Sequence, residues 1–241
     1  MIIHSKIDKG IIRHSNQDAF VAGQLSPQIA FGIVCDGMGG ANAGNVASEI
    51  AVKTVSEYLY NSYRDNMTID DFDKVVKNAI ASANMQVFDR ASKNDALKGM
   101  GTTIVAAVIK GNEAVIAHVG DSRIYLVNDS IQQLTKDHSI VQTLVESGKI
   151  TLEDAKVHPR KNVITRALGV ESEVMVDSDF LTVNPNDTLM LCTDGLTNFV
   201  SEDIILETFK NTELSTVCDK LVELANDGGG GDNITVVTLT A

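Results

Sequence analysis

The chain has 241 residues, of which 44% are hydrophobic, and a formal net charge of -12 at pH 7. A chain of this length can bury a substantial core, and its acidity argues against nonspecific binding to nucleic acid or to an anionic membrane surface. It has no run of 18 apolar residues and no basic region followed by an apolar stretch. We therefore expect a cytoplasmic protein with no signal peptide and no membrane insertion.

Nine segments are predicted to be strands because their apolar residues alternate or run continuously. They are residues 2–8, 18–24, 29–35, 102–109, 113–119, 123–128, 174–183, 187–192 and 233–239. Turn-forming residues at 111–112, 128–129 and 184–187 separate neighbouring segments. This spacing predicts antiparallel hairpins.

Five helices are predicted where apolar residues recur on one helical face. They lie near residues 47–59, 72–87, 138–147, 202–210 and 214–222. The first two follow one another, which favours a helical hairpin. Strands and helices come in blocks, and no linker or repeat divides the chain. The pattern is typical of an α+β fold with antiparallel sheets in a single domain, residues 1–241.

Five aspartates lie at the boundaries of predicted strands: Asp18, Asp36, Asp121, Asp194 and Asp232. If these strand ends converge, the carboxylates repel one another unless cations bind between them. Oxygen ligands without paired His or Cys favour hard divalent ions, Mg²⁺ or Mn²⁺. Gly37 is expected to turn the backbone sharply and to bring its carbonyl to an ion. An Asp-Gly pair after a strand is also an ordinary turn, so spacing alone leaves both interpretations open.

Eight short motifs follow one another along the chain. They are RHSNQDA at 13–19, CDGMGG at 35–40, GMGTT at 99–103, HVGDSRIYL at 118–126, TKDHS at 135–139, ITRALG at 164–169, CTDGLTN at 192–198 and GGDNITVV at 230–237. In this order they resemble the motifs of the PPM, or PP2C-type, metal-dependent protein serine/threonine phosphatases, of the bacterial type. The resemblance implies a four-layer α-β-β-α sandwich with two antiparallel sheets and a mobile flap around residues 145–170.

The resemblance also implies a two-metal site. Asp36, Asp194 and Asp232 would hold the first ion, while Asp36 and the carbonyl of Gly37 would hold the second. Asp36 would therefore bridge the two ions. Two divalent ions about 3.5 to 4 Å apart can share a water, lower its pKa and present hydroxide to phosphorus at neutral pH.

Two further acids receive supporting roles from the resemblance. Asp18 is expected to act through bound water, and Asp121 is expected to hold a third ion together with Asp194. The expected cofactors are therefore Mn²⁺ or Mg²⁺, with two catalytic ions and a third.

Arg13 is the candidate for binding the phosphate group. Negative charge spreads over the phosphate oxygens in the transition state, and a guanidinium can bind two of them in a planar fork. The leaving serine or threonine oxygen needs a proton, but Met38 stands where some relatives have a histidine, so the proton donor stays open. His118 and His138 are expected to be structural histidines.

Residues 149–166 contain five basic and two acidic side chains in an otherwise acidic chain. In the resemblance this region is the flap beside the active site. We expect Arg160 and Lys161 to help receive the phosphopeptide substrate. A solvated helix and loop without such a role is an equal alternative, because exposed Lys and Arg usually contribute little.

The sequence predicts a metal-dependent enzyme that hydrolyses phosphoserine and phosphothreonine in proteins. The expected partners are phosphorylated proteins, namely a bacterial Ser/Thr kinase and its substrates, with no nucleic acid and with a monomer as the default state. Three alternatives are weighed against this prediction. A phosphatase dedicated to an anti-sigma-factor antagonist is disfavoured by the stretch HPRKNVITRALG, and a non-catalytic pseudophosphatase by the presence of Asp36, Asp194 and Asp232. A phosphodiesterase or nucleotidase stays open.

Overall fold

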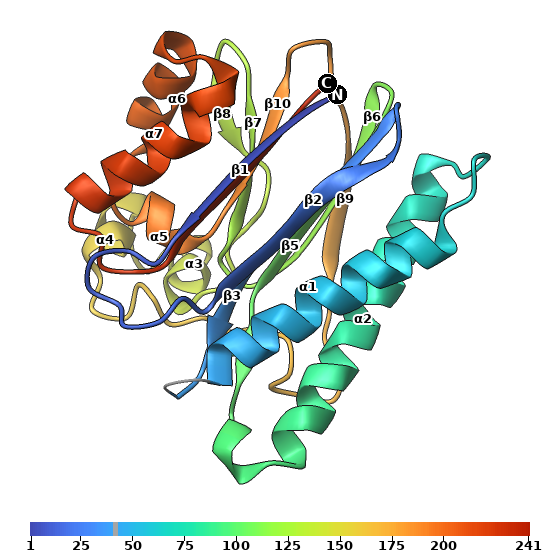
Figure 1. Ribbon diagram of the computed structural model, residues 1–241. Helices are drawn as coiled ribbons and strands as arrows, with labels where there is room; N and C mark the ends of the chain where they lie inside the picture. The colour runs from blue at the N-terminus through green and yellow to red at the C-terminus, as the bar shows by residue number, and fades with distance from the viewer. Residues whose placement is uncertain (41–42) are drawn as a thin grey trace.

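The computed structural model describes residues 1–40 and 43–241, whose strands form two sheets packed face to face (Figure 1). The first sheet has the order β1 (Ile2–Asp8), β11 (Ile234–Thr240), β10 (Thr188–Cys192), β7 (Arg123–Val127) and β8 (Ile131–Gln133). The second has the order β2 (Asp18–Ser26), β3 (Ile29–Met38), β5 (Ile104–Lys110), β6 (Glu113–Val119) and β9 (Asp177–Thr182), and β4 (Gly101–Thr102) pairs with the end of β3. All these strand pairs are antiparallel.

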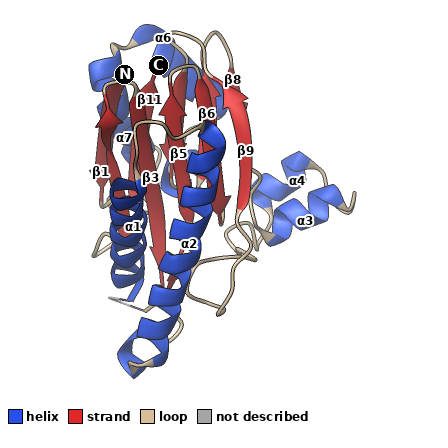
Figure 2. Cartoon of the chain, turned by 90° about the vertical axis from the view of Figure 1, so that its right-hand side faces the viewer, coloured by secondary structure: helices blue, strands red, loops and turns tan. Residues whose placement is uncertain are grey.

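Helices cover both outer faces of the sheets. The second sheet is covered by α1 (Ala43–Ser62) and α2 (Ile69–Ser92), and the first by α6 (Glu202–Asn211) and α7 (Leu214–Asp227) (Figure 1). Figure 2 shows α3 (Ile140–Glu146) and α4 (Leu152–Val157) projecting away from the sheets. The short helices are α5 (Asp194–Thr197) and a 3₁₀ turn, Asp95–Leu97. The predicted four-layer α-β-β-α sandwich is confirmed.

The central strands read as continuous apolar runs because both of their faces are buried. In β3, Phe31 and Ile33 pack toward α1 and α2, whereas Val34 packs toward the first sheet. In β5, Ile104 and Val105 divide in the same way between the two layers. The core between the sheets and the core under the helices are therefore built from alternate residues of the same strands.

Several local predictions differ from the structure. Residues 184–187 connect β9 to β10, which lie in different sheets, so the predicted hairpin there is wrong. The strand expected to end at residue 35 continues to Met38, because its last residues pair with β4. The shortest elements, β4, β8, α4, α5 and the 3₁₀ turn, are too short to show a period in the sequence. The predicted hairpins at 111–112 and 128–129 are confirmed.

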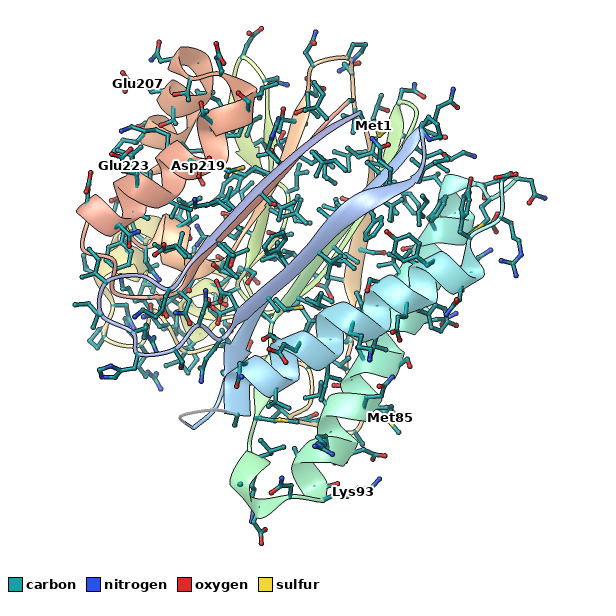
Figure 3. All side chains as sticks on the ribbon, viewed as in Figure 1. Met1, Met85, Lys93, Glu207, Asp219 and Glu223 are labelled. Atoms are coloured by element: carbon teal, nitrogen blue, oxygen red, sulfur yellow. The ribbon has the colours of Figure 1, made fainter. Side chains whose placement is uncertain are left out.

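The acidic character of the chain is visible on its outer helices. Figure 3 shows Glu207, Asp219 and Glu223 on α6 and α7, and all three are exposed, although Asp219 pairs with Lys6 of β1 at 2.7 Å. Met85 and Lys93 project from the α2 region on the opposite side of the molecule. Among residues 1–40 and 43–241, no helix combines the length and the apolar character required to cross a bilayer.

Candidate active site

Asp18 and Asp36 lie opposite each other on two neighbouring strands of the second sheet. They are paired positions in the β2–β3 ladder, so their side chains leave the sheet on the same face. The backbone of Asp36 is fixed by Thr103, whose hydroxyl accepts the Asp36 N–H at 3.0 Å and whose N–H donates to the Asp36 carbonyl at 2.9 Å. The register of two neighbouring strands thus brings together two acids that are 18 residues apart.

Asp18 also joins the two sheets. Its Oδ2 accepts hydrogen bonds from the hydroxyls of Thr193 at 2.9 Å and Thr235 at 2.7 Å, which belong to the first sheet or directly follow it. The side chain is buried, and its other oxygen, Oδ1, has no hydrogen-bond partner within the described part of the chain. A buried carboxylate oxygen without a partner is costly unless a cation or water satisfies it.

Asp194 and Asp232 reach the same place from the first sheet. Asp194 begins α5 directly after β10, and its Oδ2 accepts a hydrogen bond from Asn198 at 2.9 Å. Its Oδ1 is buried and has no partner in the described residues. Asp232 precedes β11, and its Oδ2 forms an ion pair with Arg13 at 2.8 Å.

The glycines that follow Asp36 and Asp194 are required by close packing of the backbone. Gly37 lies inside β3, so the expected sharp turn at this residue is wrong. A Cβ on Gly37 would lie 2.1 Å from the carbonyl oxygen of Gly44, and one on Gly195 would lie 1.9 Å from the carbonyl oxygen of Asn233. Both Asp-Gly pairs therefore allow a second segment to approach the acid closely.

Asn233, which the sequence did not single out, organises the loop that carries Arg13. Its Oδ1 accepts the Gln17 N–H at 2.8 Å, and its Nδ2 donates to the carbonyls of Lys9 at 2.8 Å and Ser15 at 3.0 Å. The side chain is buried, so these bonds satisfy it fully. Its place directly after Asp232 in the GGDNITVV motif was the signal available in the sequence.

Asp121 lies in the loop between β6 and β7, beside a fixed ion pair. Two residues later, Arg123 binds Asp137 through a planar fork, with its Nε at 3.0 Å from Oδ1 and its Nη2 at 2.7 Å from Oδ2. The same guanidinium donates to the hydroxyl of Tyr125 at 3.1 Å. These contacts place an ion pair at the edge of the acid cluster, in which Asp137 raises the pKa of Asp121 and Arg123 lowers it.

The carboxyl groups are held close enough to perturb one another. Burial, reinforced by the charge of Asp194, raises the pKa of Asp18 and the pKa of Asp121 to about 7. Burial and the charge of Asp18 raise the pKa of Asp36 well above its ordinary value. Burial and the charge of Asp232 raise the pKa of Asp194. The metal-free site therefore retains protons to a higher pH than free carboxyl groups do.

Divalent cations fit this arrangement. The donors are oxygens, and two of them are buried without partners in the part of the chain that the structure describes. The mutual repulsion that raises the pKa values of these carboxyls disappears when cations lie between them. Hard ions such as Mg²⁺ and Mn²⁺ prefer such ligands. The donor set and its electrostatics thus match the ions that the sequence predicted.

We expect the metal-free protein to lose stability as the pH rises from 5 to 7.5. The site carboxyls have raised pKa values, so the folded state keeps protons that the unfolded state releases above about pH 4, and stability falls until the folded pKa is passed. The pKa of His138 is lowered by burial and acts in the opposite direction, but four carboxyls outnumber it. The melting temperature should fall by about 5 °C or more, since about 1 kcal/mol corresponds to about 2–4 °C at this size.

Scanning calorimetry of the metal-free protein checks this, with Mn²⁺ as the control. Mn²⁺ should raise the melting temperature more at pH 7.5 than at pH 5, because cations bind deprotonated carboxylates. A metal-free melting temperature that stays level or rises across this range would contradict the carboxylate cluster.

A groove of about 750 Å³ runs from Asp121 and Asp194 to the flap region. Lys161 contributes to its lining, whereas Arg160 is exposed outside it.

Met38 packs against Gly101, where a Cβ would meet the Met38 methyl group at 2.6 Å. Its thioether has no proton to donate.

The comparisons with known proteins agree with this geometry. The family model described as Protein phosphatase 2C matches residues 5–223. The chain belongs to the protein phosphatase 2C family. It is accordingly a metal-dependent protein phosphatase, and the family predicted from the eight motifs is confirmed.

Three relatives of this phosphatase illustrate the similarity. The chain is 43% identical to a serine/threonine phosphatase, stp, of Listeria innocua over 96% of this chain and 92% of the relative. The crystal structure of Stp1 from Staphylococcus aureus has a TM-score of 0.93 and 34% identity over 99% of this chain and 94% of that one. The catalytic domain of the serine/threonine phosphatase PstP, in complex with two manganese ions, has a TM-score of 0.85 and 35% identity over 98% and 96% of the two chains.

Proposed function

We propose that this protein phosphatase hydrolyses phosphoserine and phosphothreonine in proteins, with divalent cations held by the carboxylates at the ends of the two sheets. The observation that carries the proposal is the set of five acids at the ends of the two sheets. Asp18 and Asp194 each have a buried oxygen that has no partner among residues 1–40 and 43–241. The relatives named serine/threonine phosphatases support the choice of substrate.

The metal ligands are proposed residue by residue. Asp36, Asp194 and Asp232 would hold the first ion, and Asp36 with the Gly37 carbonyl the second. Bound divalent cations supply a water that ionises near neutral pH and a positive charge for the phosphate oxygens. Mn²⁺ or Mg²⁺ suits these oxygen donors, and the relative that contains two manganese ions supports the number of catalytic ions.

Two other acids complete the proposed site. Asp121 would hold a third ion together with Asp194. Asp18 would act through water, because one of its oxygens is already occupied by the two threonine hydroxyls and the other lacks a partner.

Arg13 is proposed to bind two oxygens of the substrate phosphate. Its side chain is half exposed and pairs with Asp232, so the guanidinium stays beside the carboxylate cluster while it is accessible to a substrate. Asn233 positions the loop that carries it. Met38 cannot donate a proton, so it does not serve as the general acid for the leaving oxygen.

Hydrolysis of a phosphothreonine peptide in the presence of Mn²⁺ and in the presence of a chelator tests the proposed function. We expect phosphate release with Mn²⁺ and none with the chelator, and recovery when Mn²⁺ is restored. A diester substrate serves as the comparison for the phosphodiesterase alternative. Activity that persists in chelator, or a clear preference for the diester, would overturn the proposal.

The flap around residues 145–170 is proposed to receive the phosphopeptide through Arg160 and Lys161. The observation in favour is that Lys161 lines the groove that begins at Asp121 and Asp194. We expect the double substitution Arg160→Glu and Lys161→Glu to lower kcat/KM for a phosphopeptide by about 3- to 10-fold, mainly through KM, since exposed charges act weakly.

The controls for the flap experiment are a second variant and a second substrate. Lys149→Glu changes a flap charge that does not line the groove and should leave kcat/KM unchanged. Hydrolysis of p-nitrophenyl phosphate, which is too small to reach the flap, should also be unaffected in the double variant. If the double variant keeps the wild-type kcat/KM for the phosphopeptide, the proposed role of Arg160 and Lys161 is wrong, and these residues are ordinary solvated surface charges.

We further propose that the protein acts in the cytoplasm, as a monomer, on a bacterial Ser/Thr kinase and on that kinase's substrates. This assignment rests on inference from the family.

A further inference from the structure

Two buried histidines, His118 and His138, lie beside the acid cluster at Gly120, the residue before Asp121. His138 contacts Gly120 twice. Its backbone N–H donates to the Gly120 carbonyl at 2.9 Å, and its ring Nδ1 accepts the Gly120 N–H at 3.0 Å. Gly120 has a φ of 110°, and a Cβ there would lie 2.6 Å from the Thr103 side chain. The ring of His138 therefore holds the Val119–Gly120 peptide, and its backbone N–H holds the Gly120–Asp121 peptide that follows.

The hydrogen bonds determine which nitrogen of His138 carries the proton. Nδ1 accepts from Gly120, so the proton must be on Nε2, which lies 3.2 Å from Oδ2 of Asp177 and donates to it. The other oxygen of Asp177 accepts from Arg166 at 2.7 Å. Asp177 thus selects the His138 tautomer whose Nδ1 can accept a hydrogen bond from the Gly120 N–H. A carboxylate fixes the tautomer of a metal-binding or catalytic histidine in the same way.

The same contacts connect the two ends of the flap. Arg166 lies near its C-terminal end, and Ser139, which precedes the flap at the start of α3, forms an isolated bridge with Ile164. The N–H of Thr165 donates to the carbonyl of His138 at 2.8 Å. The hydrogen-bonded chain from Arg166 through Asp177 and His138 to Gly120 is therefore continuous from the flap to the acid cluster.

A metal ion is a poorer occupant for this group of side chains. One ligand atom each from His118, His138 and Asp177 lie within 4.8 Å of one another. However, the two imidazole rings are stacked, with centroids 4.6 Å apart and planes only 16° apart. The lone pairs of a ring lie in its plane, so two nearly parallel stacked rings cannot both point at one ion. His118 Nε2 is also occupied, because it donates to the Lys136 carbonyl at 2.9 Å.

We propose that His138, oriented by Asp177, is a positioning residue that fixes the Val119–Gly120 peptide, which leads into Asp121, and hence the Asp121 carboxylate. The inference rests on the proposed function for the ion at Asp121, but the fixed peptide is a property of the metal-free chain. Through the hydrogen bonds from Arg166 to Asp177 and from His138 to Gly120, a displacement of Arg166 in the flap would alter the affinity for that ion.

Two substitutions at residue 138 distinguish the loss of the hydrogen-bond acceptor for the Gly120 N–H from the loss of the volume of the imidazole ring. Asn places an oxygen where Nδ1 lies, so His138→Asn keeps an acceptor for the Gly120 N–H. Gln places a carbon there, so His138→Gln removes the acceptor. Asp177→Asn should act like His138→Gln, because Arg166 retains the amide oxygen and the NH₂ group then faces Nε2, which favours the ring form with its proton on Nδ1.

The first measurement is amide hydrogen exchange at Gly120 in the metal-free protein, followed by NMR. We expect exchange about tenfold faster or more in His138→Gln and Asp177→Asn, and within about threefold of the wild type in His138→Asn. Equal rates in all four proteins would overturn the proposal, as would His138→Asn exchanging as fast as His138→Gln.

The second measurement is calorimetric titration of Mn²⁺ into the same four proteins and into Asp121→Asn. Asp121→Asn should abolish the binding of one ion. His138→Gln and Asp177→Asn should lower the affinity for that same ion by about 10- to 100-fold, which is usual when a supporting hydrogen bond is lost. Unchanged affinity in both would overturn the proposed effect on the ion. If Asp121→Asn leaves the titration unchanged, the third ion of the proposed function is wrong, and the Gly120 exchange rates still decide whether His138 holds the peptide.

Discussion

Asp36→Asn is expected to lower kcat for phosphopeptide hydrolysis by about 10³-fold or more in saturating Mn²⁺, which corresponds to about 4 kcal/mol. The proposed role of Asp36 is to share its carboxylate between two ions, so the substitution removes one negative charge from both. Asn has nearly the same shape, and the backbone bonds of this residue to Thr103 do not involve the side chain. Initial rates over a Mn²⁺ series measure the loss.

The same substitution should stabilise the metal-free protein. Burial and the neighbouring charges raise the pKa of Asp36, so its ionisation opposes folding at pH 7.5, and a neutral side chain removes that cost. The metal-free melting temperature should rise by about 3 °C or more. Asp73→Asn is the matched control, because Asp73 also has a buried oxygen without a partner but lies on α2. It should change neither kcat nor the response to Mn²⁺. The interpretation fails if Asp36→Asn keeps more than about a tenth of the activity, or if it lowers the metal-free melting temperature.

Gly195→Ala should lower kcat/KM by about 100-fold or more and destabilise the fold by about 1–3 kcal/mol. In a helix, alanine normally stabilises relative to glycine. Here the added Cβ would lie 1.9 Å from the carbonyl oxygen of Asn233, so α5 and the loop before β11 must separate. Asp194 and Asp232 lie on these two segments, and Asn233 holds the loop of Arg13. Kinetics on a phosphopeptide and denaturant unfolding measure the two effects.

Gly40→Ala is the matched control for this prediction. A Cβ on Gly40 meets no heavy atom of the described residues within 4 Å, and its φ does not require glycine. We expect activity within about threefold of the wild type. Wild-type activity in Gly195→Ala would show that the spacing of the two segments does not control the site.

The sheets and long helices could be predicted from the sequence because their apolar periods extend over many residues. The run 29–35 and the repeat at 72–87 are examples, and both lie within the elements that the structure contains. The order of strands in the two sheets could not be predicted, because pairing between distant segments leaves no local signal. The stretch 184–187 has the composition of a hairpin turn but connects two different sheets.

The acids of the candidate site could be predicted as a group, but not the contacts that hold them. The role of Gly37 depends on how closely Gly44 approaches, which is a property of the packed fold. The hydrogen bonds of Asn233 and of His138 also join residues far apart in the chain. These residues lie within the motifs, but only the structure supplied their partners.

Anomalous diffraction from crystals of the protein grown with Mn²⁺ tests the central claim most directly, because it locates the ions independently of activity. The account predicts two strong peaks in contact with the Asp36 carboxylate, one of which also contacts Asp194 and Asp232. The absence of a peak at this carboxylate, or peaks held instead by His118, His138 and Asp177, would contradict it.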